Sequence, residues 1–251
     1  MKILRLGQSL GSNNPSIGFT NIYSLDFDGV DDYVTMGNVT LLEITGDVTV
    51  SAWLYLRSFQ NNDVVVRMGG DTELEADNFL YTIAVTGSGA TGSNYNVFGG
   101  HEYSTGSNQF AVFTTNLSLS TWYHIAMVRD TTAKTWTLYV NGSDYTPYTY
   151  THQATGGTTS PFQFAKNSTQ YLDGIVDEVS VFNTDLSDAQ ILNIYNSGTP
   201  TDLSGESNLV GYWRNGDPTG TGAYPTIVDV SKGNDGTMTN MASGDIITTV
   251  P

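Results

Sequence analysis

The sequence predicts an all-β protein, built as an antiparallel sandwich of two sheets with one short helix. Three observations predict this fold class. Short segments in which apolar and polar residues alternate recur along the chain and are divided by turn residues, which is the pattern of half-buried strands. The composition, with 27 glycines, 15 tyrosines and only 14% charged residues, suits strands and turns better than helices. The length of 251 residues is normal for one large sandwich with a full core.

The first strands follow a stretch rich in Gly, Ser, Asn and Pro, Gly7–Gly18, which we expect to be an extended arm. Candidate strands then come in this order: Tyr23–Phe27, Tyr33–Met36, Val48–Leu56, Val64–Met68, Phe79–Val85, Tyr95–Gly99, Gln109–Thr114, Trp122–Arg129 and Thr135–Val140. Asn141-Gly142 is a strong hairpin signal, because both residues tolerate positive φ, so another strand is expected at Ser143–Tyr150. Phe162–Ala165 and Gly174–Phe182 complete this set.

One short helix is expected near residues 187–197. Ser187 and Gln190 form a capping box, Ile191, Ile194 and Tyr195 then line one face, and Gly198 ends the turn. We expect the apolar face to close one end of the sandwich rather than to bind a partner. A linker loop at Thr199–Asn208 leads to an apolar strand at Leu209–Arg214.

Charge and composition exclude several classes of protein. Nine Lys and Arg against 25 Asp and Glu give a net charge of −16, which repels phosphate backbones and argues against nucleic-acid binding. The chain has no cysteine, so it has no disulfide, thiolate nucleophile or Cys-type zinc site. The start lacks the apolar stretch of a signal peptide, and no run approaches the roughly 20 apolar residues of a membrane span. We expect synthesis in the cytoplasm and no membrane insertion.

The stretch from Tyr23 to Val34 is the most informative part of the chain. Apolar and acidic residues alternate to Asp28, Gly29 lets the backbone turn, and a second strand follows. Asp28, Asp31 and Asp32 are crowded together, and such carboxylates repel one another unless a cation or hydrogen-bond donors meet them. Calcium, which prefers oxygen ligands, fits this turn.

This stretch, together with Val48–Leu54, resembles the opening of a laminin-G-like jelly roll of the concanavalin A-like lectin and glucanase superfamily. Three further segments carry the resemblance: Ser120–Val128, Leu138–Gly142 and Leu172–Asn183. With the capped helix they cover roughly Tyr23 to Gly198 in the order of that family. The resemblance implies a jelly roll with one concave and one convex sheet, and with ligands held at the concave face or along a rim. It does not specify function, because the superfamily includes lectins, hydrolases, adhesion modules and virion proteins.

The C-terminal segment is out of the family's usual order. An apolar strand at Leu209–Arg214 and a turn-rich loop at Asp229–Thr237 resemble segments that usually precede the Phe-Asp-Gly string. We therefore expect an N-terminal arm at residues 1–22 and one sandwich at residues 23–251, with residues 205–251 completing a permuted fold. The alternative is a truncated second repeat. The tail also resembles modules of structural proteins of marine bacteriophages.

The resemblance implies a structural calcium that ties an early strand to a late one. The corresponding ligands are Asp28, the Gly29 carbonyl, Asp31 and Asp177, with Asp235 as an addition from the tail. Asp177 stands out because it lies within the otherwise apolar strand at 175–182, where an uncompensated charge is costly. The alternative is that Asp28 and Asp31 only organise the turn by accepting local backbone N–H groups.

No catalytic residues are predicted. Laminarinase-type hydrolases of this superfamily carry Glu-x-Asp-x-x-Glu on one strand, and the chain lacks that string. Tyr95, His101 and Tyr103 instead offer aromatic faces beside polar groups, which suits contact with either a glycan or a partner protein.

The sequence therefore predicts a non-catalytic attachment or assembly protein. The main reading is a virion structural protein, such as a capsid-decoration, tail or fibre subunit, with possible glycan binding on a virion or extracellular surface. Its partners would be other copies of itself in a homo-oligomer, or other virion proteins. The alternative is a free carbohydrate-binding lectin module, and a degenerate glucan hydrolase is third.

Overall fold

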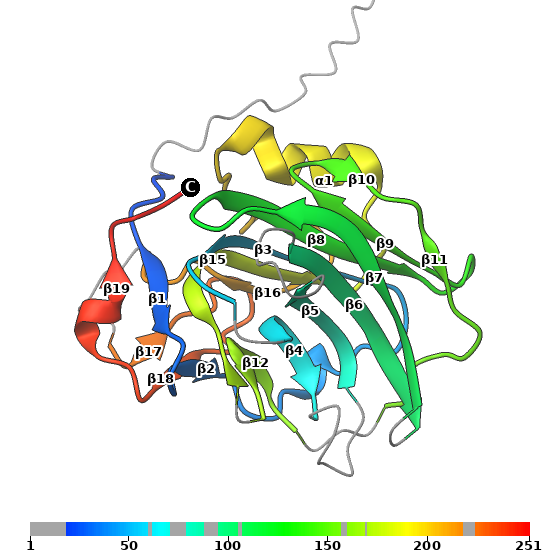
Figure 1. Cartoon of the computed structure of the whole chain (residues 1–251), viewed down its shortest axis with the longest axis horizontal. Helices are drawn as coiled ribbons and strands as arrows, with labels where there is room; N and C mark the ends of the chain where they lie inside the picture. The colour runs from blue at the N-terminus through cyan, green and yellow to red at the C-terminus, as the bar shows by residue number, and fades with distance from the viewer. Residues whose placement is uncertain are drawn as a thin grey trace, which may run out of the picture.

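The computed structural model describes residues 19–59, 62–70, 79–87, 95–104, 107–156, 160–168, 170–217 and 224–251. Two antiparallel sheets pack face to face, and the single α-helix of this described part lies against one of them (Figure 1). The predicted two-sheet jelly-roll sandwich with one short helix is confirmed. The predicted arm at Gly7–Gly18 lies outside the described residues. No helix of the described part is long and apolar enough to cross a membrane.

The first sheet has the strand order β10-β9-β8-β3-β15-β1-β19, with β11 paired to β9 and β16 paired to β15. Its strands are β1 (Ser24–Asp28), β3 (Val48–Leu56), β8 (Trp122–Asp130), β9 (Thr135–Val140), β10 (Ser143–Asp144), β11 (Tyr148–Thr149), β15 (Asp173–Phe182), β16 (Leu209–Trp213) and β19 (Ile246–Ile247). The predicted strand at Ser143–Tyr150 is thus two short strands, both paired with β9.

The second sheet has the order β17-β18-β2-β12-β4-β5-β6-β7. Its strands are β2 (Tyr33–Thr35), β4 (Asp63–Gly69), β5 (Phe79–Gly87), β6 (Tyr95–Ser104), β7 (Ser107–Leu117), β12 (Phe162–Phe164), β17 (Thr226–Ile227) and β18 (Gly236–Thr239). A separate small pair joins β13 (Lys166–Asn167) to β14 (Gln170–Tyr171), and short 3-10 turns occur at η1 (Thr40–Leu42), η2 (Asn196–Gly198) and η4 (Ser243–Asp245).

The main core fills the space between the two sheets. Phe162 and Phe164 of the second sheet pack against Trp213 of the first, with ring centroids 5.1 and 5.6 Å apart. All three side chains are buried, as is Trp136 on β9. Burying side chains of this size stabilises the fold by about 1.5–3 kcal/mol each. A second apolar cluster lies under the helix, on the other side of the first sheet.

The helix α1 (Asp188–Tyr195) covers this second cluster with Ile191 and Ile194. The predicted capping box is present, because the Ser187 backbone N–H and hydroxyl both donate to Gln190 Oε1. The end of the helix differs from the prediction. Asn196, not Gly198, is the left-handed residue that terminates it, at φ 45°.

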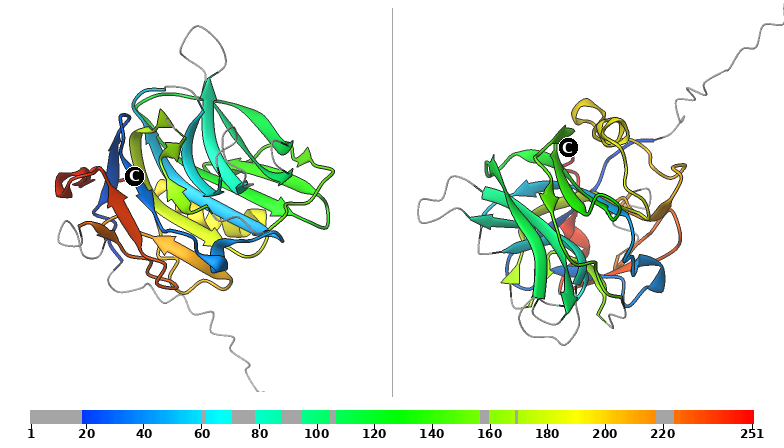
Figure 2. Two further views of the ribbon diagram at one scale, coloured as in Figure 1. Left: turned by 90° about the horizontal axis from the view of Figure 1, so that it is seen from below. Right: turned by 90° about the vertical axis from the view of Figure 1, so that its right-hand side faces the viewer.

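The C-terminal segment contributes strands to both sheets. β16 pairs with β15, β18 pairs with β2 and β19 pairs with β1. Figure 2 shows the orange and red C-terminal strands beside the blue N-terminal ones. Residues 19–22 of the predicted arm also lie against the sandwich, where Asn21 donates to Asp177 and the Ile22 backbone N–H donates to Asp217.

Candidate functional site

A groove lies on the outer face of the second sheet, the face turned away from the main core. Its volume is about 170 Å³. Phe110 on β7 is paired with Gly100 on β6, and Gly100 is paired with Thr82 on β5. Because paired residues share a face, Phe110 and Thr82 lie on the same face with Gly100 between them, and the backbone and Cβ of Phe110 fill the place that a side chain at Gly100 would take. The groove is lined by Asn62, Arg67, Thr86, Phe98, Asn108, Phe110, Val112 and Asn167.

The apolar wall of the groove consists of Phe98, Phe110 and Val112. Phe98 pairs with Val112 across β6 and β7, and its ring lies 5.9 Å from that of Phe110 at an angle of 56°. Phe110 and Val112 are 38% and 52% exposed, which is unusual for large apolar residues in the middle of a strand. These side chains give the groove an aromatic and aliphatic surface that is open to a ligand.

The opposite wall is polar and held in place by hydrogen bonds. Arg67 donates from Nη1 to Asn167 Oδ1 at 3.0 Å, and Asn167 donates from Nδ2 to the Asn62 carbonyl at 3.2 Å. The Arg67 guanidinium also lies over the Phe79 ring.

On β7, the buried Oδ1 of Asn108 has no hydrogen-bond partner among the described residues. An unpaired buried acceptor is costly, so a ligand donor here would be favourable.

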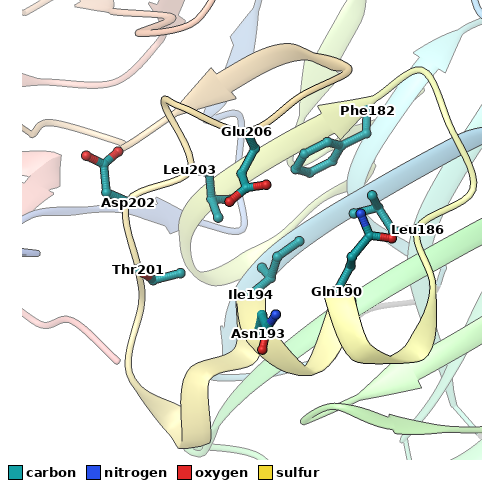
Figure 3. A pocket seen from close by; sticks show the side chains of 9 residues that line it. All are labelled: Phe182, Leu186, Gln190, Asn193, Ile194, Thr201, Asp202, Leu203 and Glu206. Carbon is teal, nitrogen blue, oxygen red and sulfur yellow. The ribbon is translucent and has the colours of Figure 1, made fainter. Parts of the chain in front are cut away.

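A smaller cavity of about 140 Å³ lies between α1 and the loop that follows it (Figure 3). Phe182, Leu186, Ile194 and Leu203 form its apolar floor, and the side chain of Glu206 lies over it. Asp202 also lines this cavity, and its Oδ1 accepts the Ser204 backbone N–H. The floor belongs to the second apolar cluster, so we interpret the cavity as part of the packing of α1 on the sheet.

Two of the three residues predicted to contact a ligand are inside the protein. His101 is fully buried: Trp136 donates to its Nδ1 at 2.9 Å, and its Nε2 lies 2.8 Å from the His152 carbonyl. Burial lowers the pKa of His101 to about 4. Tyr95 is 6% exposed and packs against Phe59. The prediction that these two rings face a ligand is therefore wrong. Tyr103 is partly exposed, but its ring stacks on His152 at 4.2 Å.

The acidic turn after β1 brings three carboxylates together. Oxygen atoms of Asp28, Asp31 and Asp32 lie within 4.8 Å of one another, and Gly29 takes the expected positive φ of 77°. Asp28 Oδ1 accepts the Val30 N–H at 2.8 Å, which is the local turn contact that the sequence also predicted. Asp32 is buried, and desolvation together with the neighbouring carboxylates raises its pKa to about 6. The set suits a hard cation in its donor chemistry.

The two remaining candidate ligands lie elsewhere. Asp28 pairs with Asp173 and Leu25 with Val176, so Asp177 lies four residues, or roughly 13 Å, further along β15. Asp235 accepts the Asp229 backbone N–H and lies beyond the pairing of Thr237 with Thr35, away from the acidic turn. The structure therefore does not bring Asp177 or Asp235 to Asp28 and Asp31.

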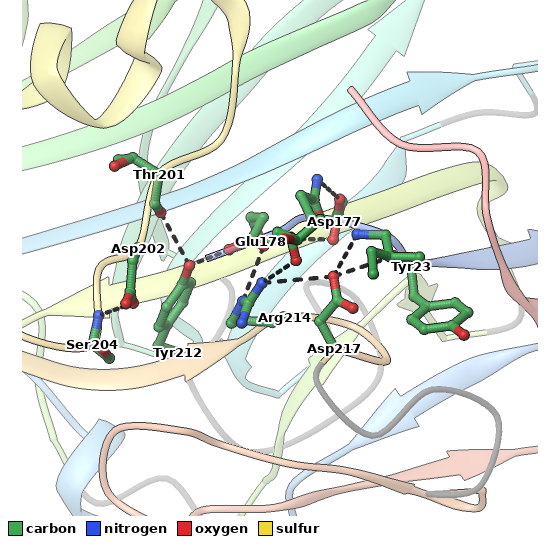
Figure 4. A network of polar contacts seen from close by, with 12 residues as sticks. Tyr23, Asp177, Glu178, Thr201, Asp202, Ser204, Tyr212, Arg214 and Asp217 are labelled. Atoms are coloured by element: carbon green, nitrogen blue, oxygen red, sulfur yellow. Dashed lines mark hydrogen bonds and ion pairs between the residues drawn. The ribbon is translucent and has the colours of Figure 1, made fainter. Parts of the chain in front are cut away.

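Asp177 instead belongs to a buried polar network (Figure 4). A bulge in β15 places both Asp177 and Glu178 on the face of the first sheet that is turned away from the main core, between the core residues Val176 and Val179, with Glu178 at φ 47°. Asn21 donates to Asp177, while Arg214 lies 3.4 Å from Glu178 and 3.6 Å from Asp217. Arg214 thus contacts two of the three carboxylates in this network. Burial and the proximity of Glu178 raise the pKa of Asp177.

Glu178 lies between a tyrosine hydroxyl and a guanidinium group. Burial raises its pKa to about 7, although the Tyr212 hydroxyl and Arg214 lower it. The Tyr212 hydroxyl contacts both Glu178 Oε2 and the Thr201 carbonyl, yet it has a single proton to donate. The hydroxyl therefore donates to only one of these two oxygens at a time. Because Asp177 and Glu178 are 0% and 4% exposed, this pair does not face a substrate.

The groove residues were not singled out from the sequence. Phe98 and Phe110 look like ordinary strand residues, and sequence alternation does not say which face of a strand meets the core.

Comparisons with known proteins agree with this fold. Residues 28–192 match the laminin-G-type family described as the concanavalin A-like lectin/glucanases superfamily. No curated protein matches the sequence. A suspected carbohydrate-binding protein from Bacteroides ovatus is similar in structure, with 16% identity and a TM-score of 0.64 over 88% of this chain. The match covers 59% of the Bacteroides protein, so this chain spans well under two thirds of its length.

Two further solved structures have the same fold. The carbohydrate-binding module of a Ruminococcus gnavus IT-sialidase, bound to α2,3-sialyllactose, is 12% identical with a TM-score of 0.57; the match covers 68% of this chain and 96% of that one. A heptameric pentraxin from Limulus polyphemus is 13% identical with a TM-score of 0.50, over 70% of this chain and 82% of that one. At these identities the likeness is one of fold.

Proposed function

This chain belongs to the concanavalin A-like lectin/glucanase superfamily, and we propose that it is a carbohydrate-binding protein without catalytic activity. The groove on the outer face of the second sheet carries this proposal. It places the exposed side chains of Phe110 and Val112, packed on the buried ring of Phe98, opposite amide and guanidinium groups. Sugars bind to such surfaces, because the C–H faces of a pyranose ring pack on apolar groups while its hydroxyls need directional polar partners.

The structural comparisons support this function over the virion assembly role that was the main reading of the sequence. Two of the similar structures are described as carbohydrate-binding, one of them with a sialyllactose bound. A role as a virion or cell-surface protein stays a prediction, and so does an extracellular location.

The degenerate hydrolase reading has little to support it in the described part of the chain. Glycoside hydrolysis needs two carboxyl groups that flank the bond to be broken. The adjacent carboxyls Asp177 and Glu178 are buried beneath Arg214 and the N-terminal residues, and no Asp or Glu lines the groove. We propose that this protein binds sugars and leaves them intact.

We also propose a structural calcium at the acidic turn, with ligands that differ from the first expectation. Asp32 takes the place of Asp177, beside Asp28 and Asp31. The cation would offset the repulsion among these three carboxylates and fix the turn between β1 and β2. Asp32 also helps to hold the backbone of the turn, because its Oδ2 accepts the backbone N–H of Asp28.

A glycan-array screen of the purified protein tests the proposed function, followed by calorimetry with the best glycan. Phe110→Ala should weaken binding at least tenfold, which corresponds to about 1.4 kcal/mol. Leu192→Ala is the matched control, because Leu192 is an exposed apolar residue (55%) on α1, outside the groove. Absence of binding to every glycan, or equal binding by both variants, would refute the proposal.

A further inference from the structure

Strand β7 is a long open edge of the second sheet. It has 11 residues and pairs on one side only, with β6. The other sheet edges in the described residues end differently. β10, β11, β17 and β19 have two residues each, and the outer side of β16 is covered where Trp213 bridges to Asp229 and the Val230 N–H donates to the Tyr212 carbonyl. A sheet edge is usually protected against unwanted strand pairing by being short or covered, and β7 is neither short nor paired on its outer side.

β7 also lacks the other usual protection, which is charge. Its sequence, Ser-Asn-Gln-Phe-Ala-Val-Phe-Thr-Thr-Asn-Leu, contains no charged residue and no proline. It lies within residues 103–128, where there is no Asp, Glu, Lys or Arg, although the chain as a whole carries a net charge of −16. Two copies of such an acidic protein repel each other over most of their surfaces. The β7 edge is a place where they can approach without placing like charges together.

We propose that β7 pairs with β7 of a second copy, as an antiparallel and self-complementary edge contact. On an edge strand, the N–H and C=O groups of alternate residues point away from the sheet, and an identical antiparallel strand satisfies them in equal number. The pairing extends from Ser107 to Thr115, because Asn116 has φ 53° and interrupts the extended backbone.

This dimer has a consequence for the groove, which rests on the proposed function. A two-fold axis that pairs identical strands in antiparallel fashion is perpendicular to the sheet, so the two copies present the same face on the same side. Phe110 and Val112 of β7 line the groove. The two grooves then lie next to each other on one continuous sheet, and a branched or repeating glycan gains avidity by occupying both.

Sedimentation equilibrium of the full chain over a range of concentrations, without any sugar, tests the pairing. The protein should show a monomer–dimer equilibrium, and Thr114→Lys should weaken it at least tenfold. Thr114 is exposed on β7 but does not line the groove. The lysine lowers the net negative charge, so it would strengthen association through any other surface. Thr121→Lys, at an exposed position before β8, is the matched control and should dimerise like the wild type.

The absence of cysteine allows a second measurement on the dimer. A spin label on Thr114→Cys should report a short distance between the two copies, and one on Thr121→Cys a longer one. The proposal is overturned if the full chain stays monomeric, if Thr114→Lys dimerises like the control, or if removing residues 1–18 abolishes the dimer. Thr114→Lys should keep the affinity of the wild type for a monovalent glycan. A dimer that binds no glycan would refute the proposed function and leave the β7 pairing intact.

Discussion

The buried carboxylates next to Arg214 contribute a loss of stability as the pH rises from 5 to 8, whereas the lowered pKa values of the buried His101 and His124 contribute a gain over the same range. The pKa of Glu178 is raised from 4.5 to about 7 by burial. A carboxyl group with a raised pKa in the folded state stabilises the fold below its unfolded pKa, and this contribution is lost as the pH rises through the folded pKa. The loss from Glu178 between pH 5 and 8 is between about 2 and 3 kcal/mol. The raised pKa of Asp177 acts in the same direction.

The perturbation is Glu178→Gln, which keeps the size of the side chain and removes its titration. Urea unfolding at several pH values between 5 and 8 gives the free energy of unfolding for both proteins. The fall with pH should be smaller in the variant than in the wild type by about 2 to 3 kcal/mol. The pH dependence is the informative quantity, because the variant also loses the contact of Glu178 with Arg214. Parallel curves for the two proteins would refute this assignment, because His101 and His124 titrate alike in both and cancel in the comparison.

Three further outcomes follow from the structure. Chelator should lower the melting temperature if calcium occupies the acidic turn, because calcium at about 100 times its dissociation constant adds roughly 2.7 kcal/mol to stability. Asp31→Asn should abolish that response, whereas Asp130→Asn should keep it, because Asp130 accepts the Thr132 N–H in a turn outside this cluster of three carboxylates. A chain that ends at Ser204 should lose cooperative unfolding, because it lacks β16, β18, β19 and the buried Trp213; a melting temperature within a few degrees of the full chain would contradict this. Removing residues 1–18 should leave the free energy of unfolding unchanged. Removing residues 1–22 should lower it by about 1.5–3 kcal/mol, because the hydrogen bond from Asn21 to Asp177 is lost. Equal denaturation curves for the two truncations would show that residues 19–22 contribute nothing to stability.

Local signals in the sequence were sufficient for most of the fold. The strands at Val48–Leu56 and Thr135–Val140 have the expected bounds, since alternation and flanking turn residues mark both ends. Asn141 and Gly142 adopt φ values of 51° and 75°, as the hairpin signal requires. The capping box of α1 is also present, because its contacts are made within one turn of chain.

The candidate site was predicted less well, because it depends on which face of each strand meets the core. Tyr95 and His101 share the inner face of β6, while Phe98 between them faces outward. Both faces of this strand carry aromatic residues, so the sequence pattern alone does not distinguish them. The outward position of Phe98 is set by the pairing of β6 with β5 and β7, which is a long-range property.

Asp177 shows a second limit of the sequence. A charge in an apolar strand indicates a compensating group, and the structure supplies one in Asn21. The sequence could not identify this partner, because it depends on the register of β1 with β15 and on the bulge between Asp177 and Ser180. The resemblance to a known family placed the residue near Asp28, roughly 13 Å from where it lies.

The location of bound sugar tests the central claim most directly. Titration of isotope-labelled protein with the best glycan from an array, followed by assigned amide chemical shifts, reports where the sugar binds. We expect the shifts to cluster on Thr86, Phe98, Asn108, Phe110 and Val112, which line the groove. Shifts confined to the cavity beside α1 or to Tyr103 and His152, or no shifts with any glycan, would contradict it.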